Sequence, residues 1–263
     1  MEACELGFLA FVACASSALF RHHTSPIAHL FDGHAFLQQL AVGLTMGLTI
    51  TAIVYSPLGK RSGAQINPAV TFTFYRLGKI NAADTFFYIL FQFAGAIAGV
   101  VLAGLTLGPL VSAPEVSFAA TVPGSSGVAV AFFAELMISA VIMGTVLYFA
   151  DHKKIMHKSG LYVGALYALY ITLEQPISGT SMNPARTLGS AIMTGTWSGV
   201  WIYFTAPLAG MLLAAEVFLW TKGKDAFHCA KLYHTTDVGE ILRCGWTALE
   251  ENDSADQDHD SIR

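Results

Sequence analysis

The segment SGAQINPAV (residues 62–70) and its echo SGTSMNPAR (residues 178–186) share the pattern S-G-x-x-x-N-P-A-x. Asn is a favourable N-cap and Pro a favourable first helical residue, so each copy predicts a helix that begins abruptly after an irregular, glycine-containing segment. The apolar runs that follow stop at Gly78 and near Gly195. At about 1.5 Å per residue, ten residues reach roughly 15 Å, half of a hydrocarbon core of about 30 Å. The two copies therefore predict half-length helices that enter from opposite faces and meet at the midplane of a membrane.

The composition also indicates an integral membrane protein, because 54% of the residues are hydrophobic, only 12% are charged, and the mean hydropathy is +0.55. Apolar runs long enough to span a membrane fall at about residues 3–20, 36–56, 85–106, 128–150, 160–178 and 198–221. The predicted fold class is an all-α membrane protein with six transmembrane helices and two re-entrant half-helices.

The basic residues predict the orientation. Twelve of the 14 Lys and Arg residues fall in segments that alternating topology places on one side of the membrane. By the positive-inside rule that side is cytoplasmic, and so are both termini. The two exceptions are Arg21, which we place in the first outer loop, and Arg186, which follows the second Asn-Pro-Ala directly and is expected inside the protein.

The chain divides into two similar halves, about residues 1–106 and 128–221, which together form a predicted channel domain over residues 1–221. Each half has three spans, an odd number, so the second half must insert upside down, as in transport proteins that build a midplane site from discontinuous helices. Residues 222–263 are predicted to form a cytoplasmic tail whose acidic end is disordered.

Twin Asn-Pro-Ala boxes at inverted positions, an Arg after the second box, and one Glu in each of spans one and four resemble the aquaporin, or major intrinsic protein, family. The resemblance implies a right-handed bundle of six helices with two half-helices, one pore per subunit, and a homotetramer. The box residues are Asn67, Pro68, Ala69, Asn183, Pro184 and Ala185.

Asn67 and Asn183 would cap the half-helices where their positive dipole ends face each other. Amide donors and partial positive charges at this point favour a neutral water or hydroxyl oxygen and oppose a cation or a hydronium. An isolated Asn-Pro could merely cap a helix, whereas two symmetric copies within membrane segments favour a pore.

Arg186 stays charged at any relevant pH and is expensive at membrane depth unless it lines water or is paired. The resemblance assigns it to the outer constriction of the pore. Counting back from the two boxes, the other positions of that selectivity filter become Met46, Ile171 and Thr180. Met46 and Ile171 could equally be core residues.

By the same resemblance, the family's strict water channels carry a His at the position of Ile171 and an aromatic residue at the position of Met46. Met, Ile and Thr predict a less polar filter, which puts exclusion of everything but water in doubt. Gln65 also departs from the usual His of the first box. Thr187 in place of the Asp typical of glycerol channels, together with Ala191 and Tyr203-Phe204, resembles the water-conducting branch.

Glu5 and Glu135 lie in apolar spans, where a carboxylate needs a partner. We expect them to support the irregular segments by accepting their backbone N–H groups. Gln65 is predicted to support its loop as well, through an amide that can both donate and accept. A proton relay is the alternative, but two isolated carboxylates form no chain.

His and Cys residues form two clusters that could bind a metal or sense pH, but neither has a recognised zinc spacing, so solvated side chains are favoured and no metal or cofactor is predicted. The clusters are His22, His23, His29 and His34 in the first outer loop, and His228, Cys229, His234 and Cys244 in the tail. No nucleophile with a base and no phosphate-binding loop is present, so an intramembrane enzyme is not favoured.

The sequence thus predicts a passive channel for water, with other small neutral solutes as candidates, in the plasma membrane and with a bacterial inner membrane favoured. Nucleic acid is not an expected partner. The alternatives are a channel of the same fold for ammonia, hydrogen peroxide, urea or a small alcohol, and a membrane scaffold with a vestigial pore.

Overall fold

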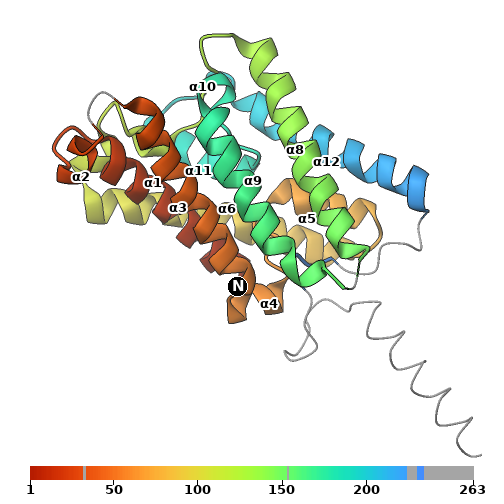
Figure 1. Ribbon diagram of the computed structural model, residues 1–263. Coiled ribbons are helices and arrows are strands. Elements are labelled where there is room, and N and C mark those ends of the chain that lie inside the picture. Colours follow the sequence, from red (N-terminus) through yellow and green to blue (C-terminus); the bar gives the residue numbers. More distant parts are fainter. Residues whose placement is uncertain (32–33, 153, 224–229, 234–263) are drawn as a thin grey trace, which may run out of the picture.

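The computed structural model describes residues 1–31, 34–152, 154–223 and 230–233, and within these ranges the regular structure is helical (Figure 1). The long helices are α1 (Glu2–Arg21), α3 (Ala35–Tyr55), α6 (Ala82–Leu107), α8 (Val128–Ala150), α9 (Ser159–Leu173) and α12 (Val200–Lys222). The half-helices are α5 (Pro68–Arg76) and α11 (Pro184–Thr194), and the short helices are α2 (Pro26–His29), α4 (Pro57–Ser62), α7 (Pro109–Ser112) and α10 (Gln175–Ser178). Single 3₁₀ turns occupy Ser117–Ala119 and Met156–Lys158.

Five of the six predicted spans form helices that are long and apolar enough to cross a membrane. The predicted span 160–178 differs, because it is split into α9, of 15 residues, and the separate turn α10. Pro176 has no N–H to donate and disfavours the helical conformation at the residue before it, which explains the break near Gln175. α9 is therefore about 22 Å long, short of a hydrocarbon core of about 30 Å.

The two halves interlock instead of forming separate bundles. α1 packs along α6 in the first half, and α8 packs along α12 in the second. α3 and α9, one from each half, form the third close pair. Each half-helix also crosses over, since α5 contacts α12 and α11 contacts α6, and both lie among the longer helices in Figure 1.

Glycines allow the paired helices to approach closely. A Cβ added to Gly95 of α6 would lie 2.2 Å from the Ala3 carbonyl oxygen, and one added to Gly99 would lie 2.0 Å from that of Gly7. Gly210 of α12 meets the Leu136 carbonyl of α8 in the same way, at 2.1 Å. The small residues of these spans therefore serve close backbone packing, as helix pairs in membranes require.

Residues 230–233 lie against the helical bundle, whereas the sequence placed them in a tail outside it. The Leu232 amide donates to the Gly63 carbonyl at 3.0 Å, and the Ser159 hydroxyl donates to the Leu232 carbonyl. Ala230 and Leu232 are buried, and the Tyr233 ring contacts Tyr55 edge-on. The remainder of the tail, including its acidic end, lies outside the described residues apart from 222–223.

We expect Gly99→Ala to destabilise the protein by about 1–3 kcal/mol, because the new methyl group must displace the backbone of α1. Gly144→Ala in α8 is the matched control, since its added Cβ meets nothing within 4 Å and Ala favours helix by up to about 1 kcal/mol. Thermal unfolding of the purified protein in detergent measures both. Equal melting temperatures for the two variants would contradict this account of the α1–α6 contact.

Candidate functional site

The two Asn-Pro-Ala boxes form the N-termini of the half-helices. Asn67 caps α5, its side-chain oxygen accepting from the Ala69 amide at 3.0 Å. Asn183 caps α11 by accepting from the amides of Ala185 at 3.0 Å and Arg186 at 3.3 Å. These are the caps that the motif predicts, and each fixes an Asn side chain at the positive end of a helix dipole.

The two caps also hold each other's loops. The Asn67 side-chain amide donates to the Met182 carbonyl at 2.6 Å, and the Asn183 amide donates to the Ile66 carbonyl at 2.7 Å. Both Asn residues and both loops are therefore locked in a reciprocal pair. The contact uses one of the two hydrogens on each amide nitrogen, so the second stays available to another acceptor.

The loops before the boxes have the same unusual backbone. Non-glycine residues with positive φ are Ala64 (50°) and Ile66 (42°) in the first loop, and Thr180 (49°) and Met182 (52°) in the second. In each loop these residues lie three and one positions before the Asn. Such conformations cost on the order of 1 kcal/mol or more each and persist only where the surroundings fix them.

Glu135 of α8 supplies that support in the second half. Its fully buried carboxylate accepts from the backbone amides of Ser181 at 2.6 Å and Met182 at 2.7 Å, and from the Ser178 hydroxyl at 2.7 Å. This arrangement matches the expectation from the sequence. It satisfies buried donors that would otherwise be costly to desolvate.

In the first half the corresponding residue is Glu2, which the sequence analysis missed. Its carboxylate accepts from the backbone amides of Gln65 at 3.0 Å and Ile66 at 2.7 Å, and from the Gln92 side chain at 2.7 Å. Glu5, expected to do this, instead accepts from the Ser62 hydroxyl at 2.9 and 3.1 Å and so supports the loop indirectly. Glu2 and Glu5 are three residues apart on one helix face, so packing had to decide between them.

Gln65 and two tyrosines complete the loop contacts. Tyr88 donates to the Ser62 carbonyl at 2.8 Å, and Tyr203 donates to the Ser178 carbonyl at 2.5 Å, so the repeat extends to the helices that cover the loops. The Gln65 side chain donates to the Ala230 carbonyl at 3.1 Å, which links the first loop to segment 230–233.

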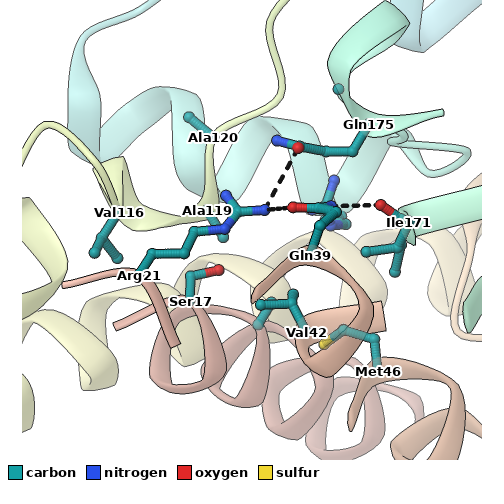
Figure 2. A pocket seen from close by; sticks show the side chains of 13 residues that line it. Ser17, Arg21, Gln39, Val42, Met46, Val116, Ala119, Ala120, Ile171 and Gln175 are labelled. Atoms are coloured by element: carbon teal, nitrogen blue, oxygen red, sulfur yellow. Dashed lines mark hydrogen bonds between the residues drawn. The ribbon is translucent and has the colours of Figure 1, made fainter. Parts of the chain in front are cut away.

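A polar cavity of about 40 Å³ lies beside the second loop (Figure 2). Its walls include Met46, Ile171 and Arg186, three of the four predicted filter residues. A water molecule needs roughly 10–15 Å³ on this measure, so the cavity has room for a few waters in a narrow space.

Thr180, the fourth predicted filter residue, is placed differently from the other three. Its hydroxyl donates to the Glu174 carboxylate at 2.5 Å, while its backbone carbonyl accepts from the Arg186 guanidinium at 3.2 Å. It is buried and does not line the cavity, although the neighbouring Gly179 does. Thr180 therefore contacts Arg186 through its backbone and not its hydroxyl.

Four further polar residues line this cavity, and the sequence analysis did not place them there: Ser17, Arg21, Gln39 and Gln175. Arg21 was placed in an outer loop, but it is the last residue of α1, and its side chain extends into the cavity. Its Nη2 donates to the side-chain oxygens of Gln39 and, at 3.4 Å, Gln175. Gln39 precedes Met46 by two helical turns on α3, so the two residues share one face of the helix. This shared face is the sequence feature that could have identified Gln39 as a cavity residue.

One histidine of the first outer loop, His23, forms a hydrogen bond with an acidic side chain. His23 lies 2.7 Å from Glu115, and His22, His23 and Glu115 offer ligand atoms within 4.8 Å of one another. The hydrogen bond from His23 lowers the pKa of Glu115 to about 2. The contact between Glu115 and His23 therefore contributes to stability above about pH 4.5, and this contribution is lost as the pH falls towards 2. The four tail residues of the second cluster lie outside the described residues.

Comparison with known proteins identifies the family, because the model of the family described as "Major intrinsic protein" matches residues 2–218. The chain belongs to the major intrinsic protein family. It is 34% identical over 226 residues to the "Probable aquaporin NIP-type" of Nicotiana alata, a match that covers 85% of this chain and 77% of that protein. It is also 34% identical over 191 residues to the "Probable aquaporin NIP7-1" of Arabidopsis thaliana, covering 72% of this chain and 66% of the relative.

The fold agrees with a solved member of the family. The aquaglyceroporin from Plasmodium falciparum superposes with a TM-score of 0.68, covering 85% of this chain and 96% of that one. At 22% identity this similarity establishes the fold alone. It confirms the predicted all-α, aquaporin-like membrane fold.

We expect Glu135→Gln to destabilise the protein by about 1.5–3 kcal/mol, because an amide cannot accept from all three donors and would place an NH₂ group against a backbone N–H. The matched control is Glu216→Gln, since Glu216 is half-exposed and pairs with Arg76 at the surface. Thermal unfolding in detergent measures both. A control that lost as much stability would show that the effect is not specific to the loop.

Proposed function

We propose that this chain is a passive channel for water and other small neutral solutes. The single observation that supports this most directly is the pair of half-helix N-termini whose capping residues, Asn67 and Asn183, each donate a hydrogen bond to the opposite loop. Two positive helix ends with oriented amide donors, held at one place inside a membrane bundle, suit a neutral oxygen-bearing molecule and disfavour a cation.

The selectivity filter in this proposal consists of Met46, Ile171 and Arg186 around the polar cavity, with Thr180 contributing its backbone. One fixed positive charge faces two apolar side chains, so the filter rejects cations while its walls remain compatible with solutes slightly larger than water. Glu2, Glu135, Gln65 and, through Ser62, Glu5 hold the loops in position. They are structural supports in this mechanism, and the channel catalyses no reaction.

The solute range is proposed to be broader than water alone. The sequence favoured the family's water-conducting branch and a bacterial source, but the relatives named above are plant proteins with NIP-type names, which support neither. A filter without a His supports a mixed range that includes urea or a small alcohol. Ammonia and hydrogen peroxide are further candidate solutes, and the same permeability assay tests them.

We place the chain in a plasma membrane as an integral protein with both termini cytoplasmic, because that orientation puts Lys60 and Arg61 on the inner side. The polar cavity then faces the outer side. The proposed domain division keeps residues 1–221 as the channel, with residues 230–233 packed against it, and the proposed assembly is the homotetramer that the resemblance implies.

Proteoliposomes that contain the purified protein should shrink faster in a stopped-flow osmotic assay than protein-free liposomes. A panel of urea, glycerol and hydrogen peroxide then measures the solute range. If every permeability equals that of protein-free liposomes, the pore is vestigial and the scaffold alternative stands.

Ile171→His should lower the permeability to urea more than that to water, because the imidazole adds a hydrogen-bonding group and narrows the polar cavity. The same liposome assay measures both rates for the variant and the wild type. Leu169→His is the control, since Leu169 lies on the same helix but is half-exposed on its outer surface. Unchanged permeability ratios for Ile171→His would remove Ile171 from the filter.

A further inference from the structure

The polar cavity contains a second guanidinium, that of Arg21, besides the one predicted from the sequence. We propose that Arg21 is a second specificity-determining residue of the pore and forms, with Gln39 and Gln175, a polar constriction next to the filter. This inference rests on the proposed channel function and adds a site that selects solutes by their hydrogen-bonding groups.

The three side chains come from different elements and meet across the cavity. Arg21 ends α1, Gln39 lies in α3, and Gln175 begins α10. Figure 2 shows the Arg21 side chain reaching towards both amides, with dashed lines to their oxygens. We call the hydrogen-bonded group of Arg21, Gln39 and Gln175 the bridge. Gln39 also donates to the Ile171 carbonyl, so the bridge is joined to a residue of the proposed filter. The hydrogen bonds of the bridge therefore join three separate elements at the wall of the cavity.

The charges in the cavity are not neutralised by acids. In the part of the chain that the structure describes, the ion pairs within 4.0 Å include neither Arg21 nor Arg186. Arg21 bonds to neutral amide oxygens and Arg186 to a backbone carbonyl. A partly buried guanidinium without a carboxylate keeps its full charge and is costly in a purely structural role. Two such charges in one narrow cavity therefore act together against cations.

The amide and guanidinium groups also define the class of solute. Arg21 offers N–H donors, whereas the side-chain oxygens of Gln39 and Gln175 are acceptors. A solute that enters the bridge must replace hydrogen bonds of both kinds. Water, urea and small alcohols carry donors and an acceptor oxygen, so they can do so, whereas a cation has no acceptor for Arg21 and meets a like charge.

Two substitutions separate the charge from the bridge. Arg21→Met removes both while keeping an unbranched side chain, and Arg21→Lys keeps the charge but loses the planar fork that reaches two amides. Arg76→Met is the matched control, because it removes one positive charge from an exposed arginine outside the cavity. Each protein is reconstituted at equal density, and the permeabilities to water, urea and methylammonium are measured by stopped flow.

We expect Arg21→Met to raise methylammonium permeability relative to water about tenfold, which corresponds to 1.4 kcal/mol, and to raise the urea-to-water ratio several-fold. Arg21→Lys should raise the urea-to-water ratio while methylammonium stays excluded, and Arg76→Met should match the wild type. If Arg21→Met does not fold, Arg21→Gln replaces it, with the same expected rise in methylammonium permeability.

Selectivity of Arg21→Met equal to that of Arg76→Met would overturn this inference, and so would a lower melting temperature with unchanged permeability ratios, since Arg21 would then be a structural link only. A wild-type protein that conducts nothing would instead reject the proposed function. The two failures are therefore distinguishable in one set of measurements.

Discussion

The structure depends on the reciprocal hydrogen bonds between Asn67 and the Met182 carbonyl and between Asn183 and the Ile66 carbonyl. Each Asn caps its own half-helix and binds the loop that leads to the other one. The two halves of the chain must therefore fold against each other before either Asn can make the hydrogen bond that its amide nitrogen donates. The same contacts bring two positive helix ends together, which is unfavourable electrostatically and must be compensated by the surrounding bundle.

The compensation comes from buried carboxylates that accept backbone amides. Irregular backbone within a membrane is tolerated only where protein or a water-filled cavity satisfies it, and Glu2 and Glu135 satisfy successive amides in both loops. In return, the loop amides stabilise charges that apolar spans could not otherwise hold. Strained backbone and costly carboxylates thus stabilise one another, and the positive φ values of Ala64 and Thr180 persist as a consequence.

In the polar cavity, too, charged side chains are held by neutral oxygen atoms of the protein. Arg186 is held by the Thr180 carbonyl, and Arg21 by two glutamine oxygens, so both guanidiniums are oriented without losing their charge. In the proposed channel, the cavity would therefore hold two guanidiniums bonded to neutral oxygens and, within the described residues, not to carboxylates.

The sequence by itself determined what local chemistry and periodicity decide. The Asn-Pro start of each half-helix, the Glu135 support and most of the apolar spans are predictable, because N-caps, helix breaks and desolvation costs depend on neighbouring residues. Only the tertiary structure decided which of Glu2 and Glu5 reaches the backbone, and that Arg21 points into a cavity. Those choices depend on how α1 is rotated and paired against α6 and α3, and residues three apart on one helix face carry the same sequence signal. The packing of segment 230–233 onto Gly63 likewise depends on a surface that exists only once the halves have interlocked.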